Sequence, residues 1–180
     1  KGMEDGAKRT VEIVKGLRLF SRVDEQDVKK VDLHDGINST IILLNSSIPG
    51  KIRIIREFGE LPMVECLAGK INQVFMNIIN NAVHALSDHM EKIPDPVITI
   101  RTKSLGDYVK IEIEDNGPGM PEHVKQRIFE PFFTTKAVGK GTGLGLSIVY
   151  SIIENHKGTL EVLTEEGQGT TFIISLPVYQ

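Results

Sequence analysis

The sequence predicts an α+β fold, a two-layer sandwich in which helices cover one face of a mixed, mostly antiparallel β-sheet. Apolar residues recur at steps of three and four in some segments and at steps of two in others. The order is helix, strand, helix, two strands, loop, helix, two strands. Short glycine turns join the last two strand pairs, so these pairs are expected to be antiparallel hairpins with the helices gathered on one side.

The N-terminal part is expected to be an appendage. Residues 4–22 carry an apolar stripe with helical spacing, and the polar residues 23–32 are expected to be a linker. A second helix begins after Asp32, whose side chain suits an N-cap, and ends at Pro49 and Gly50. We therefore expect an appended helix within residues 1–22, a linker over residues 23–32 and one domain over residues 33–180.

The other elements follow from alternation, helical periodicity and turn residues. The expected elements are strand 51–58, helix 68–89, strands 97–104 and 108–115, helix 143–156 and strands 159–166 and 170–177.

Composition limits the function. The formal net charge of −3 supplies no basic surface, so we expect no nucleic-acid partner. Cys66 is the single cysteine, so we expect a small core residue and a reducing, cytoplasmic location. No apolar run approaches the roughly 20 residues of a membrane helix. The chain begins at Lys1, so we expect a piece of a longer protein, which can still carry a membrane anchor.

Asparagines break the pattern of the helix 68–89. Asn72, Asn77, Asn80 and Asn81 lie close together there, although Asn is a poor helix former. Asn77 and Asn81 are four residues apart, so their amides project from one stripe and can reach a common ligand. The alternative is a solvated polar face.

Asp115 breaks the pattern of a strand, because it continues the apolar row of Ile111 and Ile113. A buried carboxylate is costly unless something accepts its charge or its hydrogen bonds. Asp115 either opens an ordinary turn to Gly117 or points inward at a donor such as the exocyclic amine of a purine. Thr170 continues the apolar row of the last strand, so its hydroxyl can line the same pocket.

Residues 117–145 form a connection too long to be passive, so we expect a mobile lid with a short helix inside it. The glycines expected to act as hinges are Gly139, Gly141, Gly143 and Gly145. Phe129, Phe132 and Phe133 are expected to anchor one end of this lid by packing, as ordinary core aromatics also would.

The glycine run before the last helix is typical of a phosphate site, because free N–H groups and the helix dipole favour anions there. It is not a Walker A loop, since Thr134 stands at the first glycine position and Gly141 follows Lys140. It is not a dinucleotide fingerprint either, since Leu144 or Leu146 occupies the place of the third glycine. Alone, the run predicts only a phosphate.

Four segments occur in order: QVFMNIINNAVHAL, DNGPGM, IFEPFFTTK and GKGTGLGLSI. They resemble the N box, first glycine box, F box and second glycine box of the catalytic, ATP-binding region of sensor histidine kinases of two-component systems. The wider superfamily includes DNA gyrase, MutL and the anti-sigma-factor kinases. The resemblance covers residues 33–180 and implies ATP bound under a lid. RTVEIVKGLRLFSR resembles the end of the family's dimerisation helix; an unrelated amphipathic helix is the alternative.

This resemblance implies ATP and Mg²⁺ as ligands. Asp115 would bind the adenine amine, Thr170 would support the adenine side, Asn81 would bind Mg²⁺, and Asn77 would lie near the phosphates. Asn77 and Lys136 would act in catalysis. The other residues implied to shape the nucleotide site are Gly117, Gly119, Lys140, Gly141, Thr142, Gly143, Leu144 and Gly145, and Lys136 or Lys140 would neutralise γ-phosphate charge.

The implied activity is transfer of the γ-phosphate of Mg-ATP to a histidine, for relay to an aspartate of a response regulator receiver domain. Asn77 occupies the position of the acidic base in hydrolytic relatives and serine kinases, and it cannot accept a proton. None of the five histidines has the family's acceptor pattern, so we expect the acceptor upstream, on the dimerisation module of a homodimeric parent. A non-catalytic nucleotide-sensing module and a slow ATPase are the alternatives.

Overall fold

The computed structural model describes residues 10–11, 14, 26–138 and 141–180. Its main sheet has the strand order β2-β4-β5-β7-β6. The strands are β2 (Arg53–Phe58), β4 (Val97–Leu105), β5 (Tyr108–Asp115), β7 (Gly169–Pro177) and β6 (Thr159–Glu165). β2 pairs in parallel with β4, and every other neighbouring pair is antiparallel. The predicted mixed, mostly antiparallel sheet is confirmed.

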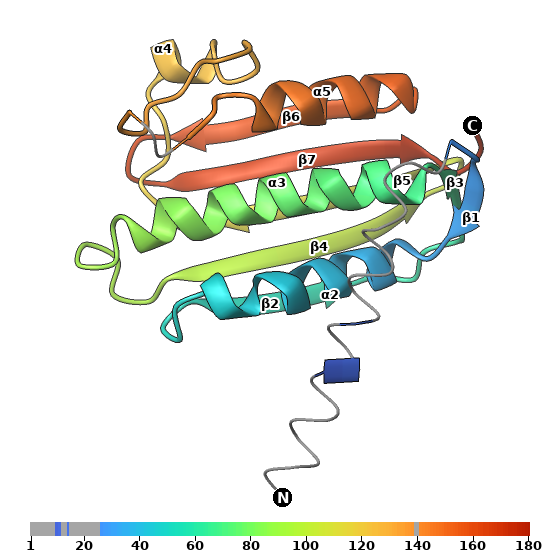
Figure 1. Cartoon of the computed structure of the whole chain (residues 1–180), viewed down its shortest axis with the longest axis horizontal. Helices are drawn as coiled ribbons and strands as arrows, with labels where there is room; N and C mark the ends of the chain where they lie inside the picture. Colours follow the sequence, from blue (N-terminus) through green and yellow to red (C-terminus); the bar gives the residue numbers. More distant parts are fainter. Residues whose placement is uncertain (1–9, 12–13, 15–25, 139–140) are drawn as a thin grey trace, which may run out of the picture.

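Three helices lie side by side on one face of this sheet, with α3 in the middle (Figure 1). They are α2 (Leu33–Leu44), α3 (Ala68–Ser87) and α5 (Gly145–Asn155). A single 3₁₀ turn, η1 (Asn45–Ser47), follows α2. Asp32 caps α2 as predicted, since its side chain accepts a hydrogen bond from the N–H of His34 at 2.8 Å. The two-layer sandwich is therefore confirmed.

The core lies between these two layers, where helical and strand periodicities meet. On β5, Ile111 and Ile113 are buried beneath the helices, while Lys110, Glu112 and Glu114 lie on the open face. α3 buries an apolar stripe along its whole length. Each fully buried Ile or Phe stabilises the fold by about 1.5–3 kcal/mol, so this interface fixes α3 firmly on the sheet.

A second, two-stranded sheet corrects the expected linker. β1 (Lys29–Val31) pairs antiparallel with β3 (Val64–Cys66), so the end of segment 23–32 belongs to the domain. Glu65 also donates its N–H to the carbonyl of Val178 at 2.8 Å. Cys66 is fully buried there, and burial raises the pKa of its thiol to about 12, as suits a core residue.

Most of the expected N-terminal helix lies outside the described residues. Thr10, Val11 and Val14 are described, and all three are helical. Across the part of the chain that the structure describes, no helix combines the length and apolar character needed to cross a membrane.

Candidate functional site

Three neighbouring strands each carry a polar side chain near the same end of the sheet, on the face that the helices cover. Asp115 on β5 lies opposite Thr170 on β7, and Thr170 lies opposite Thr164 on β6. The hydroxyl oxygens of Thr164 and Thr170 are 2.9 Å apart. Asp115 is only 6% exposed. We call these three residues the polar floor; it lies at the end of the sheet opposite β1 and β3 (Figure 1).

Asp115 is a buried carboxylate supported by backbone groups. Its Oδ1 accepts a hydrogen bond from the N–H of Gly117 at 2.9 Å. Burial raises the pKa of Asp115 to about 6, against the lowering effect of N–H groups of Gly117 and Thr170, and nearby Glu114 raises it further. The opposing contributions come from backbone N–H groups and not from a cation. Asp115 therefore suits an external hydrogen-bond donor.

The turn after β5 is tied to the polar floor through Thr164. The N–H of Met120 donates to Thr164 Oγ1 at 2.9 Å, and this hydroxyl donates to the carbonyl of Gly169 at 3.1 Å. Gly119 has φ +65°, and a Cβ there would lie 1.9 Å from the carbonyl oxygen of Glu165. Only glycine fits this position without moving the backbone. Sequence reasoning missed Thr164, although it breaks the apolar row of β6 just as Thr170 breaks that of β7.

One stripe of α3 links the two glycine-rich turns. The Asn77 side chain donates from Nδ2 to the carbonyl of Gly145 at 3.3 Å. A Cβ at Gly117 would lie 3.6 Å from the Cβ of Ala85. Asn77 and Ala85 are about 12 Å apart along the helix axis, and the half-buried Asn81 lies between them. The two predicted ligand asparagines therefore lie between the first and the second glycine box.

Asn72, near the start of α3, does not share this arrangement. Asn72 is 4% exposed and faces α2, since a Cβ at Gly36 would lie 2.3 Å from its Oδ1. Gly36 thereby allows α2 and α3 to approach closely. Asn72 is therefore a packing residue between two helices.

The second glycine box is fixed by the F-box segment before it. The N–H of Phe132 donates to the carbonyl of Gly143 at 2.9 Å, and Gly143 has φ +69°. A Cβ at Gly143 would lie 2.4 Å from the carbonyl carbon of Phe132. Thr142 accepts a hydrogen bond from the N–H of Leu144 at 3.3 Å. α5 begins at Gly145, two residues later than expected, because Gly143 and Leu144 belong to the turn that precedes the helix.

The three phenylalanines of the F-box segment divide into two groups. Phe129 and Phe133 pack against the core, Phe129 contacts Tyr150 at 5.5 Å between ring centroids, and Arg127 lies 4.5 Å from the Phe133 ring centroid. Phe132 is 75% exposed, with φ +65°. The expectation that all three anchor by packing is wrong for Phe132, because its side chain is exposed.

Lys136 reaches α3 from the connection between β5 and α5. Its Nζ lies 2.9 Å from Nδ1 of His84, one helical turn beyond Asn81. A Cβ at Gly141 would lie 3.0 Å from the Lys136 side chain, so Gly141 lies beside it. Lys140 lies outside the described residues. His84 is a second residue near the site that sequence reasoning did not assign to it.

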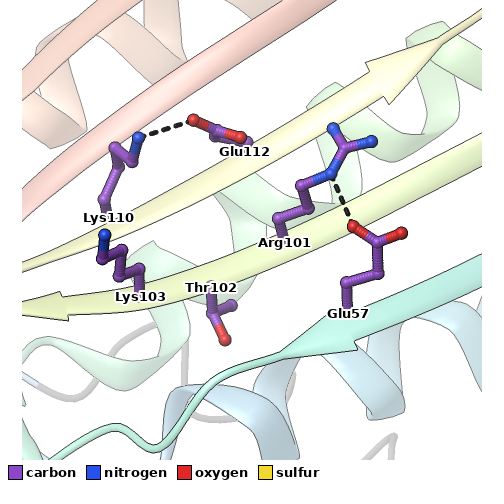
Figure 2. Close-up of a pocket in the computed structure, with 6 residues that line it drawn as sticks. All are labelled: Glu57, Arg101, Thr102, Lys103, Lys110 and Glu112. Carbon is purple, nitrogen blue, oxygen red and sulfur yellow. Dashed lines mark hydrogen bonds and ion pairs between the residues drawn. The ribbon is translucent and has the colours of Figure 1, made fainter.

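A hollow on the opposite, open face of the sheet is separate from this arrangement (Figure 2). Arg101 bonds to Glu57 at 2.6 Å and also pairs with Glu114, and Lys110 pairs with Glu112 at 2.7 Å. The charged groups of these pairs largely satisfy one another. The open face therefore supports the sheet with ion pairs, while the polar floor lies on the helix side.

The fold and these features define a class of protein. Residues 67–180 match the family described as Histidine kinase-, DNA gyrase B-, and HSP90-like ATPase, and the chain belongs to this family. Within the family, the chain is the ATP-binding catalytic region of a sensor histidine kinase, as its relatives show.

Two relatives, one of them in two solved structures, support this placement. Sensor kinase CckA of Brucella abortus (strain 2308) is 37% identical over 191 residues, covering 97% of this chain and 20% of CckA. The catalytic domain of histidine kinase ThkA has a TM-score of 0.73 and 31% identity, covering 86% of this chain and 97% of that domain. ThkA in complex with response regulator protein TrrA has a TM-score of 0.69 and 27% identity, covering 97% of this chain and 49% of that chain. The chain thus spans only a fifth of the length of CckA.

Proposed function

We propose that this domain binds Mg-ATP between the polar floor and α3 and transfers the γ-phosphate to a histidine on a dimerisation module. The observation that carries the proposal is the buried carboxylate of Asp115. Its pKa is raised chiefly by burial and not by a charged neighbour. Such a group is costly to the fold, which is understandable if it serves a ligand.

The polar floor suits the adenine base. Asp115 would accept a hydrogen bond from the exocyclic amine, and Thr170 would line the same side, supported by Thr164. Gly117, whose N–H binds Asp115, would bring the backbone close to the base, and Gly119 would hold this turn by its close approach to the carbonyl of Glu165.

The stripe of α3 beside the second glycine box suits the phosphates. Asn81 would offer one amide oxygen to Mg²⁺, a hard cation that takes oxygen ligands and keeps several from phosphates and water. One neutral ligand fits an ion that arrives with the nucleotide. When bound, Mg²⁺ supplies charge neutralisation to the phosphates. Lys136, and by sequence Lys140, would add positive charge, and the backbone of residues 141–145 would approach the phosphates closely.

Asn77 supports transfer to an acceptor that brings its own nucleophile. Its amide donates to the carbonyl of Gly145 and cannot act as a base, so it would position the start of α5 beside the phosphates. A histidine imidazole needs no such base, because its free nitrogen is already nucleophilic. Catalysis would then depend on alignment and charge neutralisation, with Lys136 supplying charge.

The partners follow from the relatives and remain proposals. ThkA is known in complex with response regulator protein TrrA, which supports a receiver domain as the downstream partner of this chain's parent. The acceptor histidine would lie on the dimerisation module of the same, homodimeric protein. A cytoplasmic position of this domain stays a prediction.

The deciding experiment mixes the chain, γ-labelled Mg-ATP and a separately produced dimerisation module that carries a histidine. We expect label on the module, and we expect Asn81→Ala to abolish it. Asn45→Ala, at an exposed position in η1, is the control and should leave transfer intact. Nucleotide binding without transfer would support a sensing module instead, and phosphate release without the acceptor would support a slow ATPase.

A further inference from the structure

A contact between His84 and Lys136 lies one helical turn from Asn81, the proposed Mg²⁺ ligand. His84 is one helical turn beyond Asn81 on α3, and its Nδ1 lies 2.9 Å from the Lys136 ammonium. An ammonium group can only donate a hydrogen bond, so Nδ1 must accept, and the ring must be the neutral tautomer with its proton on Nε2. The contact therefore requires an uncharged His84.

The surroundings of His84 keep it uncharged at neutral pH. Burial lowers its pKa first, and the charge of Lys136 lowers it further. Asp88, which caps the C-terminal end of α3, acts in the opposite direction. Among the described residues, these two side chains are the charged groups that act on His84. In this contact, His84 therefore holds Lys136 without adding a charge of its own.

We propose that His84 is a phosphate-sensing residue: it accepts a hydrogen bond from Lys136 and takes up a proton when the triphosphate of a nucleotide binds beside Asn81. The triphosphate competes for the Lys136 ammonium and frees Nδ1. The proton comes from solvent and bonds to Nδ1, giving an imidazolium. Two positive charges then face the phosphates where one was present before.

This inference rests on the proposed nucleotide site. It adds the uptake of a proton by His84 when the nucleotide binds. A positive charge beside an anion raises affinity, so lower pH should strengthen the phosphate interaction through His84. Asp115 acts oppositely, because a bound amine favours its ionised form and releases a proton. The net number of protons taken up on binding is therefore a sum of opposite contributions, and variants of single residues are needed to separate them.

Calorimetric titration of the 180-residue chain with Mg-ATP near pH 7, in buffers of different ionisation enthalpy, measures protons taken up per nucleotide. His84→Gln keeps an acceptor for Lys136. We expect this variant to take up fewer protons per nucleotide, by at most about one. His123→Gln, an exposed histidine on α4 (Glu122–Lys125), is the matched control and should leave uptake unchanged. The Asp115 contribution cancels in the difference.

A second measurement does not depend on nucleotide. Lys136→Met removes the donor and its charge, so the pKa of His84, followed by NMR of its ring protons, should rise in the empty protein. Equal proton uptake in the unaltered chain and His84→Gln, or a His84 pKa unmoved by Lys136→Met, would overturn this inference alone. Failure of the unaltered chain to bind Mg-ATP would overturn the proposed function, and this inference with it.

Discussion

At the scale of single residues, Asp115 is costly to the fold because its carboxylate is buried. Its pKa is about 6 in the folded protein against an ordinary value of 3.8. The folded state therefore binds a proton more tightly than the unfolded state, and the fold loses stability as the pH rises from about 4 to above 6. At pH 7 this cost is about 3 kcal/mol at most.

Asp115→Asn removes that charge and keeps an oxygen for the Gly117 N–H. We expect the variant to be more stable than the unaltered chain at pH 7, by up to about 3 kcal/mol, and the difference to disappear near pH 4. Urea unfolding at several pH values measures both curves. A difference that does not change with pH would contradict this account of the pKa of Asp115.

Gly119 tests whether the first glycine box is held by close packing. Gly119→Ala places a Cβ 1.9 Å from the carbonyl oxygen of Glu165 and also strains a backbone with φ +65°. Gly106→Ala is the matched control, since Gly106 has φ +73° and open space around it. We expect about 1–2 kcal/mol of lost unfolding free energy for the control and clearly more for Gly119→Ala. Equal losses would show that the backbone there can move away.

The residues of the site differ in how readily sequence reveals them. Asp115 and Thr170 are visible because each interrupts an apolar row, and the same rule could have found Thr164, which interrupts the apolar row of β6. His84 is not visible, since its meaning depends on a lysine 52 positions away in the chain. Tertiary contacts of this kind leave no periodic signal.

At the scale of elements, the proposed adenine site lies where three neighbouring strands meet one end of the sheet. Thr164→Val removes the hydroxyl that accepts from the Met120 N–H and bonds to Thr170. The partly buried N–H then lacks its acceptor, so we expect a loss of about 1–3 kcal/mol in the free energy of unfolding and weaker nucleotide binding.

Thr159→Val, at the exposed start of the same strand, is the control and should change the unfolding free energy by less than about 0.5 kcal/mol. Urea unfolding and calorimetric binding check the two variants. Equal behaviour of the two threonines would mean that the Thr164 hydroxyl does not hold the first glycine box.

Long periodic elements could be predicted, and short ones could not. α3 and the two hairpins follow from many residues of consistent spacing. β1 and β3 have three residues each, too few to show alternation, and they pair across more than thirty residues of chain. The parallel pairing of β2 with β4 also escapes prediction, because no local feature of a strand records which neighbour it pairs with.

At the scale of the whole molecule, the two faces of the sheet have different roles. The helix-covered face carries the polar floor and the stripe of α3 with Asn77 and Asn81. The open face is lined by ion pairs. Exposed ion pairs contribute little stability each, so the buried core on the helix side holds the fold together. The proposed nucleotide site lies on that same side. This arrangement offers a nucleotide site, while the proposed acceptor histidine belongs to another module.

The most direct test of this account is a calorimetric comparison of Mg-ATP and Mg-GTP binding to the 180-residue chain. Guanine has a carbonyl oxygen where adenine has its exocyclic amine, so it would face the Asp115 carboxylate without a donor. We predict one site that binds Mg-ATP, binds Mg-GTP at least tenfold more weakly, and loses affinity for Mg-ATP in Asp115→Asn. Equal affinity for the two nucleotides, or undiminished Mg-ATP binding by Asp115→Asn, would contradict the central claim that the polar floor recognises adenine.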